Sequence, residues 1–105
     1  MPASPFIQRA YDVDGRQLWC RFFQAEPDGQ SFYCRYEIDW AEGARNRRIY
    51  GVDEVQALLL AMQAAHTDLL AAREHKGRQV TWLEDRSLGL PISRSVRDWD
   101  PENRF

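Results

Sequence analysis

Hydrophobic and polar residues alternate strictly between residues 31 and 40, where the sequence reads SFYCRYEIDW. An alternation with period two over this length predicts a β-strand with one apolar face. The preceding segment QLWCRFFQAE, residues 17–26, has the same pattern and predicts a second strand. Between them, the run Pro-Asp-Gly at residues 27–29 suits a type I turn closed by a glycine in the left-handed region. The two segments therefore predict a hairpin with a three-residue loop.

This loop sets the register of the hairpin, because a slip by one residue would turn one strand over. With a three-residue loop, each apolar residue of the first strand lies opposite an apolar residue of the second, whereas a two-residue loop would set Phe22 against Arg35. We therefore expect three pairs on one face, namely Phe22 with Cys34, Cys20 with Tyr36, and Leu18 with Ile38.

The same register predicts that the two cysteines, Cys20 and Cys34, are free. They lie diagonally on one face, where neighbours are about 7–8 Å apart. A disulfide requires Cβ atoms about 4 Å apart.

The following segment, AEGARNRRIYG, continues the meander. A tight turn at Gly43-Ala44 would set Trp40 against Arg47 and Ile38 against Ile49. An earlier strand, FIQRAYD at residues 6–12, is joined by an Asp14-Gly15 turn. Both faces of this strand are mixed, so its register is left open.

The longest element is a helix within YGVDEVQALLLAMQAAHTDLLAAREHKG, residues 50–77. Asp53 followed by Gln56 has the spacing of a capping box, and Gly77 suits the C-terminal end. Its apolar residues recur at helical spacing and predict the face that packs on the sheet. That stripe consists of Val55, Leu58, Leu59, Met62, Leu69 and Leu70.

RQVTWLE, residues 78–84, predicts a fifth short strand whose place in the sheet is left open. We expect a single α+β domain over residues 1–93, followed by a mobile tail over residues 94–105 that has little to bury. The expected architecture has two layers, with a four-stranded antiparallel meander, one long helix on one face and then the fifth strand, in the order β-β-β-β-α-β.

The sheet face away from the helix carries aromatic and arginine side chains, a composition typical of binding hot spots. We expect it to bind a protein partner or a second copy of the chain. Single-stranded nucleic acid is an alternative, since bases stack on aromatic rings, and a solvated face covered by the tail with Trp99 is another. The candidate residues are Trp19, Arg21, Phe23, Tyr33, Arg35, Arg48 and Tyr50.

A second hypothesis places a small enzyme or metal site at Cys20, Cys34 and His66, which converge if the thiols point at the helix and His66 points at the sheet. The sequence has neither a C-x-x-C pair nor a nearby second histidine to support it. A histidine on an apolar helix face is more often a hydrogen-bonded core residue, so we assign no catalytic residue, metal or cofactor.

Composition limits the remaining possibilities. The chain has 105 residues, 44% hydrophobic and 29% charged, with a net charge of −2. This is ordinary globular composition, without the basic field that recruits nucleic acid. No apolar run is long enough to span a membrane, and residues 1–12 lack the pattern of a secretory signal. We therefore expect a cytoplasmic protein.

Two segments, GVDEVQALLLAM and WLEDRSLGLPI, resemble a family of small uncharacterised bacterial α+β domains of unknown function. The resemblance covers most of residues 5–92 and implies no catalytic residue. It depends on a helix start and a strand with its following turn, namely Gly51, Asp53, Gln56, Ala57 and Leu58, and then Trp82, Leu83, Leu88, Gly89 and Pro91.

Overall fold

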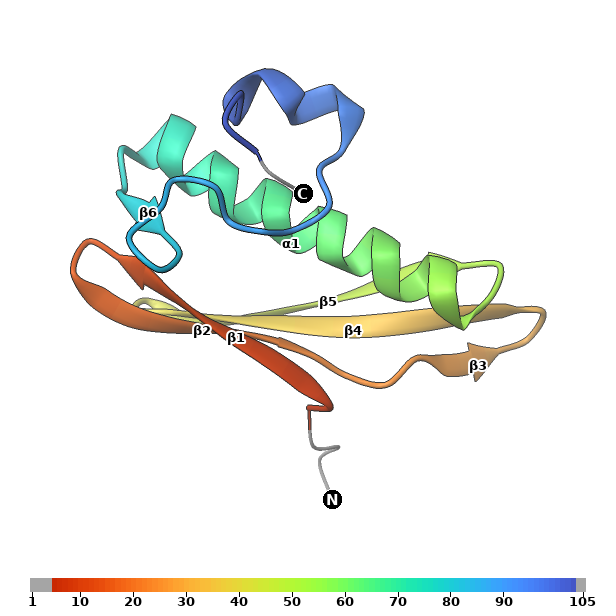
Figure 1. Ribbon diagram of the computed structural model, residues 1–105. Helices are drawn as coiled ribbons and strands as arrows, with labels where there is room; N and C mark the ends of the chain where they lie inside the picture. Colours follow the sequence, from red (N-terminus) through yellow and green to blue (C-terminus); the bar gives the residue numbers. More distant parts are fainter. Residues whose placement is uncertain (1–4, 104–105) are drawn as a thin grey trace.

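The computed structural model describes residues 5–103 and consists of a sheet, a long helix on one of its faces, and a C-terminal segment on the far side of that helix (Figure 1). The α+β class with a largely antiparallel sheet and one long helix is therefore confirmed, but the sheet has six strands rather than four plus one. The elements are β1 (Ile7–Val13), β2 (Arg16–Phe22), β3 (Glu26–Asp28), β4 (Ser31–Trp40), β5 (Gly43–Gly51), α1 (Glu54–Lys76), β6 (Val80–Thr81) and the 3-10 helix η1 (Arg94–Trp99).

The strands lie in the order β5-β4-β2-β1-β6, and β3 pairs with the same edge of β4 as β2 does. The sequence left the register of the first strand open. In the structure Val13 lies opposite Arg16, across a two-residue turn in which Asp14 and Gly15 both have positive φ. The last strand pairs with β1, where Val80 lies opposite Val13.

The register expected for the first long hairpin is wrong by two residues along β2 and by three along β3. Phe22 lies opposite Tyr36, and Glu26 lies opposite Tyr33. Residues 23–25 therefore face only residues 34–35, which is a β-bulge with one extra residue on the first strand. The turn itself is Gly29-Gln30, closed by the pair Asp28 and Ser31. The bulge restores the side-chain alternation, so the apolar faces of β2 and β4 still coincide.

The register expected between β4 and β5 is wrong by four residues. The turn is at Ala41-Glu42, so Trp40 lies opposite Gly43 and not opposite Arg47. Arg47 instead lies opposite Tyr36, and its guanidinium donates to the Tyr36 hydroxyl at 3.1 Å. Because the shift is an even number of residues, every side chain of β5 remains on the face expected for it.

Both ends of α1 are those that the sequence predicted. Asp53 is the N-cap, and its carboxylate accepts from the backbone N–H of Gln56 at 2.8 Å. The Gln56 side chain accepts in turn from the N–H of Val52 at 2.8 Å. Gly77 ends the helix in the left-handed region with φ 63°.

The helix face that packs on the core coincides with the predicted stripe only in part. Leu69 and Leu70 are fully buried, and Leu58 and Met62 pack against the core, as predicted. Val55 and Leu59 are 65% and 44% exposed, whereas three alanines at four-residue spacing have no exposed surface. Small side chains let the helix backbone lie close to the sheet, which a row of leucines would prevent. The buried helix residues are Ala57, Ala61, Ala65, His66, Leu69, Leu70, Ala72 and Arg73.

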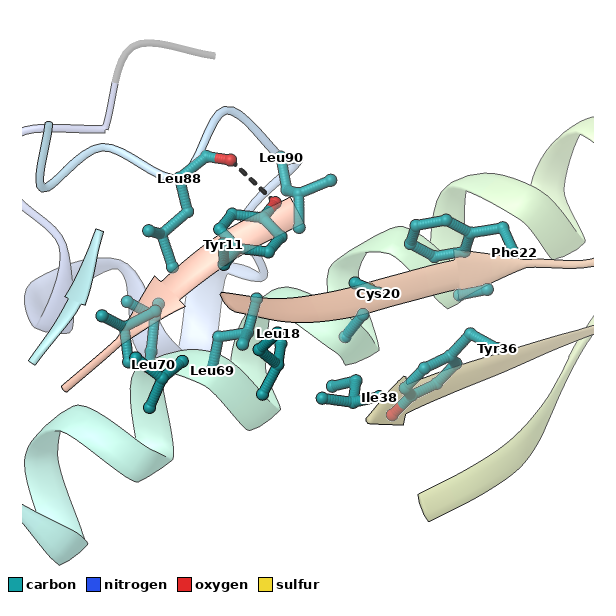
Figure 2. Packing of buried hydrophobic residues seen from close by; sticks show 14 of the residues in the cluster. Tyr11, Leu18, Cys20, Phe22, Tyr36, Ile38, Leu69, Leu70, Leu88 and Leu90 are labelled. Atoms are coloured by element: carbon teal, nitrogen blue, oxygen red, sulfur yellow. Dashed lines mark hydrogen bonds between the residues drawn. The ribbon is translucent and has the colours of Figure 1, made fainter. Parts of the chain in front are cut away.

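Figure 2 shows the core between β1, β2, β4 and α1, in which Tyr11 also reaches the segment after β6. The Tyr11 hydroxyl donates to the carbonyl of Leu88 at 2.9 Å. Arg9 donates to the carbonyls of Leu88 and Gly89 and lies 3.9 Å above the Trp82 ring. A side chain at Gly89 would collide with Trp82 at 2.4 Å. The WLEDRSLGLPI motif therefore has a packing role.

The segment that was expected to be a mobile tail folds against α1 as far as residue 103, and its last two residues lie outside the described part of the chain. Val96 is buried, and the ring of Trp99 packs edge-on against His75 at 5.2 Å. The segment lies on the side of the helix opposite the sheet (Figure 1), so Trp99 does not cover the outer sheet face.

Candidate functional site

The face of the sheet opposite α1, here called the outer face, carries all seven candidate binding residues. β2 supplies two of them, β4 and β5 supply two each, and Phe23 follows β2 within the bulge. Alternation along these strands places them there, since the intervening residues Cys20, Cys34 and Tyr36 are buried under the helix. No helix lies over the outer face in the described part of the chain (Figure 1). The seven are Trp19, Arg21, Phe23, Tyr33, Arg35, Arg48 and Tyr50.

Arg35 and Arg48 lie directly opposite each other on β4 and β5. The Arg35 guanidinium lies 3.6 Å above the Phe23 ring and donates to the side-chain oxygen of Asn46. The Arg48 guanidinium lies 4.6 Å from the Tyr33 ring centre. Neither forms an ion pair with a carboxylate within residues 5–103. The pair is therefore an uncompensated positive charge held flat on aromatic rings.

Beside these arginines, Tyr33 and Tyr50 form a cross-strand pair with ring centres 5.7 Å apart. The Tyr33 hydroxyl donates to Glu26 at 2.6 Å, and this hydrogen bond raises the pKa of Tyr33. The Tyr50 hydroxyl donates to Asp28 at 3.1 Å. The expected register placed Phe23 opposite Tyr33. In the structure the bulge places Glu26 opposite Tyr33 instead.

The other half of the outer face is electrically balanced. Arg21 lies opposite Glu37, not opposite Arg35 as the expected register implied. Its guanidinium is 3.8 Å from the Asp39 carboxylate and donates to the Gln8 side chain at 3.2 Å. Trp19 lies opposite Ala10 and is half-buried. The uncompensated charge is thus confined to Arg35 and Arg48.

Phe23 differs from the other six candidates because it is only 6% exposed. The guanidinium of Arg35 covers its ring. Phe23 therefore supports the arginine, and a partner on the outer face would contact Arg35 first.

The two cysteines of the alternative site are free, as predicted, and both are fully buried. Burial raises the pKa of Cys20 to about 12 and also raises the pKa of Cys34. Both therefore remain neutral thiols at neutral pH, and a neutral thiol is a poor nucleophile and metal ligand. The Cys34 thiol donates to the carbonyl of Phe23 at 3.3 Å, within the bulge.

His66 is buried and hydrogen-bonded, but its partners belong to the C-terminal segment and not to the thiols. Its Nδ1 lies 3.0 Å from the carbonyl of Pro91, and its Nε2 lies 3.4 Å from the carboxylate of Asp100. Since a carbonyl can only accept, Nδ1 carries the proton. Burial lowers the pKa of His66, and the contacts with Pro91 and Asp100 partly oppose this. The expected orientation toward the cysteines is wrong.

The sequence also gave no reason to expect Arg73 in the interior. It is 9% exposed, donates to the backbone carbonyls of Val80 and Arg86, and has a pKa lowered by burial. It holds the chain after the helix against α1. One sequence feature could have shown that this chain folds back, namely the apolar residues Leu88, Leu90, Ile92, Val96 and Trp99 that recur beyond the helix.

Two hollows of about 480 Å³ and 340 Å³ flank Trp40 at the end of the molecule where α1 ends. Arg78 lies between them, 5.3 Å from the Trp40 ring centre, and its guanidinium pairs with Glu42 at 2.9 Å. This pair lowers the pKa of Glu42. The cation between the two hollows is thus compensated, while Arg45 and Lys76 also line the smaller one.

The described residues contain no group of three or more histidine, cysteine, aspartate or glutamate side chains placed to hold a metal ion. Within residues 5–103, no helix combines the length and the apolar character needed to cross a bilayer. A family model described as a domain of unknown function, DUF6968, matches residues 7–92. The chain belongs to this family. Comparisons with curated proteins and with solved structures give no match.

Proposed function

We propose that the chain is a non-enzymatic binding protein of the bacterial cytoplasm whose outer sheet face holds a protein partner. One observation carries the proposal, namely the opposed Arg35 and Arg48, which have no ion pair in the described part of the chain and lie on aromatic rings. Like charges opposite each other cost stability. A partner that supplies carboxylates would remove this cost.

The geometry also favours affinity. Stacking on Phe23 and Tyr33 restricts the two guanidinium groups before binding, so less side-chain entropy is lost when a partner arrives. Tyr50, which is 48% exposed, adds an aromatic surface next to the charges. Arginine and tyrosine are among the residues that dominate binding energy in protein interfaces.

A second copy of the chain is one candidate partner, because the outer face also carries Glu37 and Asp39 on β4. Across a two-fold axis, these carboxylates could meet Arg35 and Arg48. An interface of this kind would be self-complementary, with Asp39 shared between Arg21 of its own chain and an arginine of the second copy.

The test compares the native chain with the double variant Arg35→Glu, Arg48→Glu in light scattering and in capture of partners from the native cell. Arg16→Glu with Arg94→Glu, at two exposed positions away from this part of the outer face, is the charge-matched control. We expect a dimer, or one specific captured protein, that the first variant loses and the control retains. Phe23→Ala is not a suitable variant, because Phe23 is buried. Its removal would destabilise the fold, and a lost association could not then be assigned to the outer face.

Two outcomes would overturn the proposal. One is that every association survives the Arg35→Glu, Arg48→Glu change. The other is that the native chain binds an oligothymidylate in a gel-shift experiment and the variant does not, while protein associations are unaffected. In that case the outer face would be a single-stranded nucleic-acid surface.

A further inference from the structure

A different surface, the free edge of β5, has the features of a site for an added strand. Among the described strands, β5 pairs with β4 alone. It is nine residues long, and most of its residues are exposed. A long open edge presents unpaired N–H and C=O groups that can bind another strand.

The ladder shows which residues present those groups. The carbonyl of Arg35 accepts from the N–H of Phe23 on the β2 side. Arg35 and Arg48 are therefore a non-hydrogen-bonded pair, and the N–H and C=O of Arg48 point away from β4. By alternation, the backbone groups of Ala44 and Asn46 point to the free edge as well.

A shallow groove of about 340 Å³ runs beside this edge, between β5 and α1. Ile49, Leu60 and Ala64 give it an apolar surface, and Arg47, Gln63, Thr67 and Ser93 complete its lining. Recognition by strand addition uses main-chain hydrogen bonds for affinity and such side pockets for specificity. The groove lies on the helix side of the edge, where alternate side chains of an added strand would point.

The charge of β5 indicates which kind of strand can pair with its free edge. β5 carries Arg45, Arg47 and Arg48 and no acidic residue, and all three arginines are exposed. The guanidinium of Arg47 lies 3.5 Å from the Asp68 carboxylate. Arg45 and Arg48 form no ion pair with any carboxylate of residues 5–103. Pairing of two β5 strands would bring together the arginines of both copies, which is unfavourable. An acidic strand has the opposite charge and meets no such repulsion.

We propose that an extended acidic segment of a partner protein adds to β5 as a further strand. Its backbone bonds to Ala44, Asn46 and Arg48. On the face away from the helix its carboxylates meet Arg48, and on the helix side an apolar side chain enters the groove at Ile49. This edge site is separate from the outer face, with which it shares only Arg48, and it does not depend on the function proposed for that face.

The probe is a fluorescein-labelled octapeptide that alternates Glu and Val, measured by fluorescence anisotropy. We expect saturable binding that weakens as salt is raised, whereas the peptide that alternates Lys and Val does not bind. Of two further peptides, one carries an N-methyl group on every Val and the other carries one on every Glu. Only one edge of the peptide pairs with β5, so one methylated set should abolish binding and the other should leave it intact.

Variants of the protein locate the site. Asn46→Pro removes an N–H that points to the free edge and keeps the bonds to β4, so we expect binding to weaken by roughly tenfold or more. Asn46→Ala, which keeps that N–H, is the matched control. Arg48→Glu should also weaken binding, and Arg94→Glu should not. Arg48→Glu tests the site even if Asn46→Pro impairs folding.

Arg35→Glu separates this site from the outer face, because Arg35 lies on β4 and its hydrogen bond to Asn46 is with the side chain, not with the backbone groups of the free edge. Peptide binding should survive this change even if the associations of the outer face are lost. The proposal is overturned if both methylated sets bind equally, if the Lys peptide binds as well as the Glu peptide, or if Arg48→Glu has no effect. Tighter binding of an oligothymidylate, unaffected by Asn46→Pro, would also overturn it and would indicate nucleic-acid binding through charge alone.

Discussion

The two faces of the sheet are made by alternate residues of the same strands, yet they differ in almost every physical property. Under α1, Cys20, Tyr36 and Ile38 have at most 1% of their surface exposed. On the outer face, Arg48 and Tyr50 are exposed and contact mainly neighbours within the sheet. The first face is stabilised by exclusion of water, and the second by stacking and hydrogen bonds that leave its charges available. Stability should therefore depend on one face and binding on the other.

The largest effect on stability should come from a cavity in the sheet face that packs under α1. Ile38→Ala removes a side chain that is 1% exposed, and we expect a loss of about 2–5 kcal/mol in the free energy of unfolding. Tyr50→Ala on the outer face should cost about 1 kcal/mol or less, the value of a cross-strand pair. Urea denaturation followed by circular dichroism measures both. Equal losses would show that the outer face is part of the core.

Overpacking under the helix should give the next largest effect. Ala61 has no exposed surface where α1 packs on the core, so Ala61→Leu should destabilise the fold by about 1–3 kcal/mol. Leu59→Ala, on the same helix at a side chain that is 44% exposed, should change stability by no more than about 0.5 kcal/mol. The sequence-based stripe predicts the opposite order, so thermal melts of the two variants decide which helix face packs on the sheet.

The sequence predicted which face each strand residue occupies, because alternation depends only on local backbone geometry. It did not predict which residues lie opposite each other. Register depends on a bulge at residues 23–25 and on the turn at Ala41-Glu42, and neither has a distinctive composition. The errors between β2 and β4 and between β4 and β5 were even numbers of residues, so the candidate surface survived, while the Arg21–Arg35 contact expected within it did not.

The helix illustrates a second limit. Its ends could be predicted from Asp53 and Gly77, since capping is local chemistry. Its orientation could be predicted only in part, because hydrophobicity ranks leucine above alanine, whereas close approach to a sheet favours alanine. Leu69 and Leu70 are buried as predicted, but Leu59 is exposed and Ala61 is buried in its place. The place of His66 depends on that orientation and on a C-terminal segment that was not expected to fold back.

The pH dependence of stability offers a third way to test the contrast between buried and open regions. Burial lowers the pKa of His66 in the folded state, so the unfolded chain binds its proton more readily. The stability associated with neutral His66 is present above the unfolded pKa of about 6.5 and is lost as the pH falls through the folded pKa. The contacts with Pro91 and Asp100 offset part of the burial, so we expect a smaller effect than either packing change.

His66→Gln provides the measurement, because glutamine is polar and does not titrate. Between about pH 7.5 and pH 5.5, the native chain should lose more of its unfolding free energy than the variant does. Urea denaturation at the two pH values gives the difference, in which the titration of all other groups cancels. A native chain that loses less than the variant would mean that the imidazolium is stabilised by Asp100 more than burial disfavours it.

The smallest effect on stability should come from the opposed arginines of the outer face. Arg35→Ala and Arg48→Ala should each change the unfolding free energy by no more than about 0.5 kcal/mol, because lost stacking and relieved repulsion have opposite signs. A double-mutant cycle separates these terms, and we expect an unfavourable coupling of about 0.2–0.5 kcal/mol between the two charges. High salt should reduce the coupling toward zero, since exposed charges are screened. A favourable coupling, or one that salt does not change, would mean that the arginines are compensated within the fold, and the outer face would then have no unmet charge for a partner to satisfy.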